Sequence, residues 1–277
     1  MSKNNNKGIC RLCGQYKKLT FEHVPPESAF NNFPVKHYRF DSVIQMMRES
    51  NSNTLWNTDG KRYEPQQRGS GGYYLCSSCN NNTGSWYISD YTYFIKCLHE
   101  VIVTNQFSTN NFYTFSLHNI YPLRIFKAIM VMFCDINKNL YRNDSIKDFL
   151  LDKESSNFDT NKYSIYIYLI KSSMRRITPI SIKATIPNPN SITMLSEISS
   201  YPFGVVLYIN KPEFEKPTGI CINDFLQYEY SSMGELTFNQ IPYYEVNTIF
   251  PDDFRSKQQI FHQRKQEQQP CPTNQQQ

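Results

Sequence analysis

The chain has 277 residues, a formal net charge of +5 and 39% hydrophobic residues. This length supports a hydrophobic core in one large or two modest domains, which excludes a small protein that needs disulfides to fold. The longest apolar run, residues 128–134, is far shorter than the roughly 20 residues that span a bilayer, and no apolar stretch of signal-peptide length begins the chain. We therefore expect a soluble, cytoplasmic protein without a membrane partner.

The excess positive charge lies near the N-terminus. Residues 1–90 hold 11 Lys or Arg against 7 Asp or Glu, whereas the rest of the chain holds 18 against 17. This balance suits a polyanionic partner such as nucleic acid, although an ordinary solvated surface explains it equally well.

The two ends of the chain are polar. Residues 1–8 and the Gln-rich residues 257–277 carry too little apolar surface to offset the entropy of ordering, so we predict that both are disordered. The rest of the first ninety residues consists of short segments broken by Gly, Pro and Asn, which is typical of a unit where metal replaces a core.

The remaining sequence predicts helices followed by a sheet. Apolar spacing predicts helices at 86–100, 122–135 and 144–153, and strands at 163–170, 180–186, 204–209 and 243–249. This order indicates an α+β fold with a mostly antiparallel sheet. We place one domain at 9–100 and a second, of unknown role, at 101–256.

Two Cys-x-x-Cys pairs, Cys10 with Cys13 and Cys76 with Cys79, supply four thiolates that can enclose a tetrahedral zinc ion. In a reducing compartment, cysteines in such pairs are better explained as metal ligands than as disulfides. The sequence therefore predicts a structural zinc site. The remaining cysteines are isolated: Cys97, Cys134 and Cys221 are expected in the core, and Cys271 in the tail.

Polar residues with catalytic chemistry follow each pair. Glu22 and His23 come after the first, and Asn80 directly after the second. Phosphodiester hydrolysis with one metal needs oxygen or nitrogen ligands for a hard divalent cation, and a general base near neutral pKa. Glu22 and Asn80 offer the ligands, and His23 the base. Because neighbours on a strand point to opposite faces, Glu22 and His23 require a distorted strand end to act together.

The order Cys-x-x-Cys, Glu-His-x-x-Pro and Leu-Cys-x-x-Cys-Asn-Asn-x-x-Gly over residues 10–84 resembles the HNH endonuclease superfamily, particularly its four-cysteine zinc branch, to which phage endonuclease VII belongs. The resemblance implies a treble-clef-like ββα-metal unit in which zinc is structural. It also implies that Glu22 and Asn80 bind a catalytic Mg²⁺ or Mn²⁺ and that His23 activates water. We expect DNA as the substrate, bacterial or phage defence as the setting, and a role for the second domain in contacting substrate or a protein partner.

This chain departs from the family pattern in two ways. The 52 residues between His23 and Cys76 exceed the usual span, so residues 27–67 form an insertion. The family's middle asparagine, which pins the loop between the strands, falls where this chain has Gly71, so the loop must be held differently.

Other roles remain open for the same residues. His23 could be a structural histidine or a stray zinc ligand, Glu22 a surface carboxylate, and Asn80 the N-cap of the following helix. The corresponding alternative is a non-catalytic zinc-knuckle module that binds nucleic acid or protein, or an inactive scaffold. The histidines without partners by spacing are treated as structural or exposed: His37, His99, His118 and His262.

Overall fold

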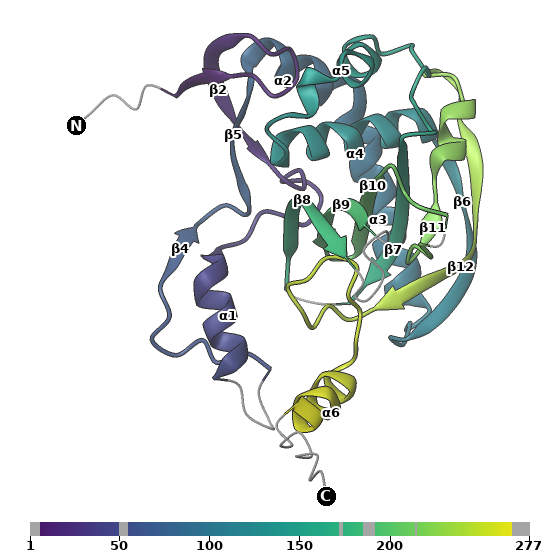
Figure 1. The fold of residues 1–277 in the computed structure, drawn as a ribbon. Coiled ribbons are helices and arrows are strands. Elements are labelled where there is room, and N and C mark those ends of the chain that lie inside the picture. Colours follow the sequence, from purple (N-terminus) through teal and green to yellow (C-terminus); the bar gives the residue numbers. More distant parts are fainter. Residues whose placement is uncertain (1–5, 50–54, 172–173, 185–191, 214, 268–277) are drawn as a thin grey trace, which may run out of the picture.

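The computed structural model describes residues 6–49, 55–171, 174–184, 192–213 and 215–267. They form a mixed fold of helices and strands with one large sheet (Figure 1). The four-cysteine region and the large sheet share one continuous hydrophobic core cluster, which runs from Cys10 and Leu12 through helix α4 to the sheet.

A small antiparallel sheet and a helix carry the cysteines. Its strands are β1 (Lys7–Ile9), β2 (Tyr16–His23) and β5 (Gly71–Cys76), in the order β1-β2-β5. A continuous helical run follows β5 directly. It comprises α2 (Ser77–Thr83), a π-helical segment (Gly84–Ile88) and α3 (Ser89–Thr104). The helix predicted at 86–100 therefore begins nine residues earlier, immediately after Cys76.

The predicted insertion contains a short hairpin and a helix that project from the small sheet as an arm (Figure 1). Strands β3 (Val35–Tyr38) and β4 (Tyr63–Gln66) pair antiparallel, and α1 (Phe40–Arg48) lies between them in sequence. The arm leaves β2 after His23 and rejoins β5 at Gly71. The loops at its base consequently adjoin the candidate site.

The large sheet has the order β6-β12-β7-β10-β9-β8, with β11 paired to β7. All its pairings are antiparallel except a short parallel contact between β12 and β7. Its strands are β6 (Asn111–Ile120), β7 (Tyr163–Ile170), β8 (Arg176–Ala184), β9 (Ile192–Ser200), β10 (Phe203–Ile209), β11 (Ile220–Cys221) and β12 (Gly234–Tyr244).

Helix α4 (Pro122–Ile136) is the central helix of the core. Pro122 occupies its first turn, where proline is favoured, and every residue from Ile125 to Asp135 is buried. The prediction at 122–135 is thus confirmed. Helix α5 (Asp144–Leu151) follows a 3-10 turn (Leu140–Arg142), and a second 3-10 segment (Asn223–Gln227) follows β11.

Some sheet predictions were wrong. The strand expected at 243–249 ends at Tyr244, and the chain then leaves the sheet, where the Thr248 carbonyl accepts a hydrogen bond from Arg176 at 3.1 Å. Strand β9 was missed because its polar residues are buried. Glu197 is 0% exposed and pairs with Arg176 at 2.5 Å. The end of the predicted strand 180–186 lies outside the described residues.

Both predictions of terminal disorder need correction. Lys7 and Gly8 pair with Lys18 and Lys17 in the small sheet, whereas residues 1–5 lie outside the described residues. Helix α6 (Lys257–Glu267) occupies the start of the predicted tail, and residues 268–277 are not described. A reciprocal capping box begins α6: the Ser256 hydroxyl accepts from the Gln259 N–H, and the Gln259 side chain accepts from the Ser256 N–H. The Ile260 side chain anchors the helix by burial.

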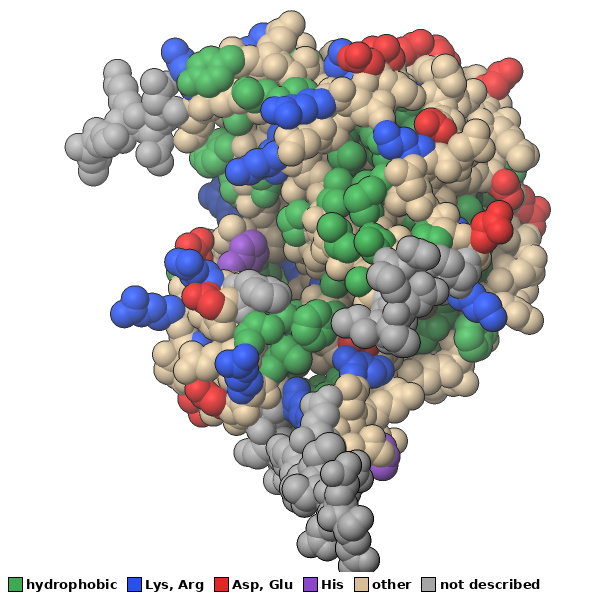
Figure 2. Space-filling view, in the orientation of Figure 1, with side chains coloured by type: hydrophobic (Ala, Val, Ile, Leu, Met, Phe, Trp, Pro, Cys, Tyr) green, Lys and Arg blue, Asp and Glu red, His purple; other side chains and the backbone are tan. Residues whose placement is uncertain are grey.

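Charges are unevenly distributed over the face shown in Figure 2. Lys and Arg side chains predominate over the small sheet, the arm carries side chains of both signs, and Asp and Glu side chains gather along the opposite upper edge. Among the helices that the structure describes, none has the length and apolar character needed to cross a membrane.

Candidate functional site

The four predicted zinc ligands converge. The Sγ atoms of Cys10, Cys13, Cys76 and Cys79 all lie within 4.8 Å of one another. Tetrahedral zinc with Zn–S bonds of about 2.3 Å places its sulfurs about 3.8 Å apart, and the Cys13 and Cys76 sulfurs are 3.9 Å apart. The spacing and chemistry of the cluster are therefore compatible with a structural zinc.

The local surroundings favour a negatively charged sulfur at Cys10. The Cys76 N–H donates to Cys10 Sγ at 3.3 Å, and the turn after Cys13 closes through Gly14, whose φ of 73° favours glycine. A hydrogen bond from the Cys79 thiol lowers the pKa of Cys10 to about 4, while the pKa of Cys79 is raised by the same contact. Thiolate is the form that binds metal.

Among the described residues, none of the isolated cysteines joins this cluster, and Cys271 lies outside the described residues. Cys134 is buried as expected and Cys97 is half-buried, but Cys221 is exposed, so its predicted place in the core was wrong. Cys221 lies on β11, a two-residue strand that leaves its side chain outside the core.

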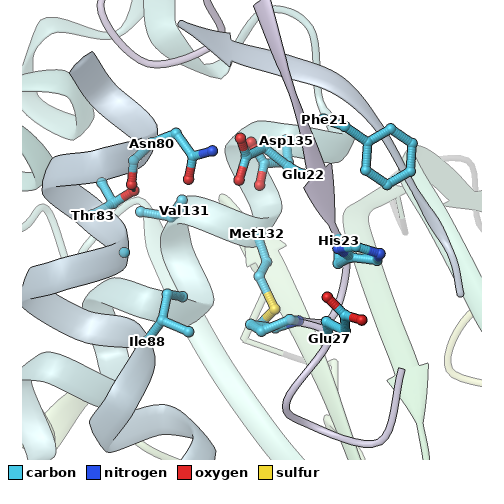
Figure 3. Close-up of a pocket in the computed structure, with 12 residues that line it drawn as sticks. Phe21, Glu22, His23, Glu27, Asn80, Thr83, Ile88, Val131, Met132 and Asp135 are labelled. Carbon is cyan, nitrogen blue, oxygen red and sulfur yellow. The ribbon is translucent and has the colours of Figure 1, made fainter. Parts of the chain in front are cut away.

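A cavity of about 200 Å³ adjoins the small sheet (Figure 3). Glu22 and His23 reach it from the end of β2, Asn80 from α2, and Met132 and Asp135 from α4. The structure thus brings together all three residues proposed for catalysis, although 57 positions separate His23 from Asn80.

The hydroxyl of Thr20 links the two proposed metal ligands. Its oxygen lies 2.9 Å from both Glu22 Oε1 and the Leu75 carbonyl oxygen, so these two acceptors share its one proton. It accepts a hydrogen bond from Asn80 Nδ2 at 3.2 Å. Asn80 is the fourth residue of α2, and the N-cap of that helix is Cys76. The capping alternative for Asn80 is therefore wrong, and its amide oxygen remains available at the cavity.

His23 is held on the other face of β2. Its ring packs edge-on against Phe21, with the centroids 5.1 Å apart, as expected for side chains two residues apart on a strand. The pairing of β2 with β5 shifts register between Thr20 and Phe21. Glu22 and His23 themselves pair in regular register with Gly72 and Gly71, so the distortion expected at these two residues is not seen, and their side chains border the cavity from opposite faces of β2. The Nε2 atom of His23 is buried without a hydrogen-bond partner among the described residues.

Asn31, in the insertion, holds the loop that follows His23. Its side chain donates to the carbonyls of Pro25 at 2.5 Å and Ser70 at 2.8 Å, and it accepts from the Ser70 N–H at 2.8 Å. An asparagine at position 71 could not hold this loop, because a Cβ there would lie 2.2 Å from the Glu22 carbonyl oxygen. A fully buried asparagine from outside the motif thus ties the loop to β5.

Arg175 braces this loop from the large sheet. Its guanidinium donates to the Phe30 carbonyl at 2.7 Å and to the Asn31 side chain, and it lies 4.4 Å over the Phe33 ring. The base of the arm is therefore bonded to the strand region that begins at β8.

Asp135 was not identified from the sequence. It follows the long apolar run of α4. In the sequence, a charged residue at this place indicates only that the buried part of a helix ends there. The structure places it in the cavity with Glu22 and Asn80 (Figure 3). Glu22 and Asp135 are 113 positions apart, and no local sequence pattern could have linked them.

Burial dominates the electrostatics of the two cavity carboxyls. Burial raises the pKa of Glu22 to about 7, against an opposing hydrogen bond from Thr20. Burial also raises the pKa of Asp135 well above its usual range, and the charge of Glu22 adds to the rise, while Arg11 opposes it. Ionising both groups together therefore requires compensating positive charge in the cavity.

The other histidines lie away from the cavity. His37 contacts Ser70 Oγ at 3.1 Å and His99 contacts the Tyr201 hydroxyl at 2.9 Å, whereas His118 and His262 are exposed and contact Glu235 and Gln266. These contacts agree with structural or surface roles.

Comparisons with protein-family models, curated proteins and solved structures find no match for this chain. Function must accordingly be inferred from the arrangement of its own side chains.

Cys76→Ser removes one of the four sulfurs, and we expect the purified variant to lose most of its zinc and to unfold at lower urea concentration. Zinc content per chain, measured by mass spectrometry of the metal, checks this. Cys221→Ser is the matched control, since this exposed cysteine lies outside the cluster. A Cys76→Ser protein that folds normally with a full equivalent of zinc would refute the four-cysteine site.

Asn31→Ala should lower the free energy of unfolding by about 2–4 kcal/mol, because it leaves buried backbone groups of Pro25 and Ser70 without partners. Urea unfolding measures the change. Asn105→Ala serves as the control, because it removes one exposed hydrogen bond to the Val101 carbonyl and should cost less than about 1 kcal/mol. Equal effects of the two substitutions would contradict the pinning role of Asn31.

Proposed function

We propose that this protein is a metal-dependent endonuclease of the HNH type, which hydrolyses phosphodiester bonds in nucleic acid. The observation that carries the proposal is that Glu22, His23 and Asn80 line one cavity beside the four-cysteine cluster. A strand pair followed by a helix presents them, in the order expected of a ββα-metal unit.

The cavity suits a hard divalent cation. Glu22 offers a carboxylate and Asn80 an amide oxygen, which are the ligand types that Mg²⁺ and Mn²⁺ prefer. Buried polar atoms of the cavity lack partners among the described residues, including His23 Nε2 and Asp135 Oδ1. Such atoms are rare in native proteins and call for an unseen ligand. The four-sulfur cluster, by contrast, favours zinc, which we assign a structural role.

Each side chain has a defined part in hydrolysis. When bound, the divalent cation supplies positive charge that stabilises the phosphate and the leaving oxygen. Glu22 and Asn80 hold and orient this charge from β2 and α2, with their positions linked through Thr20. The neutral imidazole of His23 accepts a proton from the attacking water, and the edge contact with Phe21 fixes its ring.

The basic surface supports nucleic acid as the partner. Exposed Lys17 and Lys18 lie on β2, the strand that ends at the cavity, and Arg68 is exposed just before β5, whereas the rest of the arm exposes both acidic and basic side chains. Lysine and arginine side chains bind phosphates without reading base sequence. We propose DNA as the substrate and a defence role against foreign DNA, with the large-sheet region contacting substrate or a protein partner.

His23→Ala should reduce cleavage about 10²–10⁴-fold, the usual contribution of a general base. The assay incubates the full chain with supercoiled plasmid, single-stranded DNA or RNA, each with Mg²⁺, Mn²⁺ or EDTA. His118→Ala is the control, because His118 is an exposed histidine on β6 and should leave cleavage unchanged.

Two results would reject the nuclease. One is the absence of metal-dependent cutting of all three substrates, and the other is equal cutting by wild type and His23→Ala. Retained binding of DNA or RNA without cutting would instead identify a non-catalytic zinc-knuckle module.

A further inference from the structure

The last turn of α4 places a carboxyl group in the cavity from outside the motif. Asp135 is 3% exposed, and its side chain points toward those of Glu22 and Asn80 (Figure 3). Since α4 is buried along nearly its whole length, this position is rigid. A side chain on such a helix can hold a ligand with little loss of conformational entropy.

The backbone of Asp135 is anchored, while one oxygen of its carboxyl group has no partner among the described residues. The Arg11 guanidinium donates to the Asp135 carbonyl oxygen and lies 4.3 Å over the Tyr74 ring. This bond fixes the end of α4 against the loop that carries Cys10 and Cys13. In contrast, Asp135 Oδ1 is fully shielded from solvent and has no hydrogen-bond partner among the described residues.

An unpartnered carboxyl oxygen in this position points to a cation. Burying an ionised carboxylate is expensive unless positive charge is beside it, and metal coordination is one of the few arrangements that compensate. Glu22 and Asn80 alone would leave one positive charge of a divalent ion unbalanced. A second carboxylate makes the site neutral, and it adds an oxygen ligand from a third element.

We propose that Asp135 is a third protein ligand of the divalent cation, together with Glu22 and Asn80. This inference rests on the metal site of the proposed function, but not on catalysis. It makes the site composite: β2 and α2 of the four-cysteine unit contribute two ligands, and α4 of the central core contributes the third.

The competing explanation is that Asp135 is a neutral, protonated carboxyl with only a packing role. Asp135→Asn separates the two explanations because asparagine has nearly the same shape but no charge. If Asp135 binds metal, the Mn²⁺ dissociation constant should rise about tenfold or more, since affinity follows the charge of the ligands. If its role is packing alone, Mn²⁺ affinity should not change.

The experiment is calorimetric titration of Mn²⁺ into the zinc-loaded full chain. Wild type is compared with Asp135→Asn, His23→Ala and the control Asp148→Asn, whose carboxylate is exposed on α5. We expect weakened binding in Asp135→Asn alone. Thermal melting with and without Mn²⁺ gives a second readout, because a ligand that binds the native state raises the melting temperature. This rise should shrink in Asp135→Asn.

A change of metal preference tests direct contact even where Asp135→Asn folds poorly. Thiolate ligands favour softer ions, so Asp135→Cys should bind Cd²⁺ more tightly relative to Mn²⁺ than wild type does. Asp148→Cys controls for an added thiol elsewhere and for exchange at the four-cysteine cluster.

The outcomes separate this inference from the nuclease proposal. Mn²⁺ binding that depends on Asp135 without any cleavage would sustain the ligand and reject the nuclease. Three results would each overturn the ligand assignment, whatever the cleavage assay shows. They are wild-type Mn²⁺ affinity in Asp135→Asn, an unchanged metal preference in Asp135→Cys, and no Mn²⁺ binding by the wild type.

Discussion

The approach of four cysteine sulfurs to within 4.8 Å is the constraint on which the candidate site depends. One pair lies in the turn before β2, and the other spans the junction of β5 and α2. Holding the sulfurs together therefore fixes two strands and a helix relative to one another. Glu22, His23 and Asn80 project from these same elements, so their convergence is a geometric result of the cluster.

A second set of contacts ties this unit to the rest of the chain. Arg11 binds the end of α4, and Arg175 binds the loop at the base of the arm, in both cases through backbone carbonyls. Carbonyl acceptors are present whatever the side chain, so these bonds fix backbone position. The continuous core beneath them makes the four-cysteine unit part of one packed structure.

The sequence predicted those features that depend on local spacing. The two Cys-x-x-Cys pairs predict a metal site from the spacing of neighbouring residues. The apolar residues of α4 and β7 likewise predict a helix and a strand close to their observed limits. Prediction from the sequence failed where polar residues form buried or regular structure. Strand β9 carries buried serines and Glu197, which looked like a loop, and α6 is polar but capped by Ser256 and Gln259.

Long-range partners were beyond the reach of sequence patterns. Arg11 and Asp135 are 124 positions apart, and Arg175 is 145 positions from Phe30. Nothing in the neighbourhood of Asn31 distinguishes it from the many other asparagines of the chain, although it replaces the hydrogen bonds that the motif lacks. Only folding brings such residues to the loop they hold.

The bond between Arg11 and the end of α4 limits how far this unit can be treated as a portable module. A fragment that stops after α3 would retain every residue of the motif, but it would lack α4, whose residues share one core cluster with Leu12, Val24 and Leu75. It would also release the arm from Arg175. Grafting the motif onto another scaffold would thus transfer its residues without the buried surface that orders them.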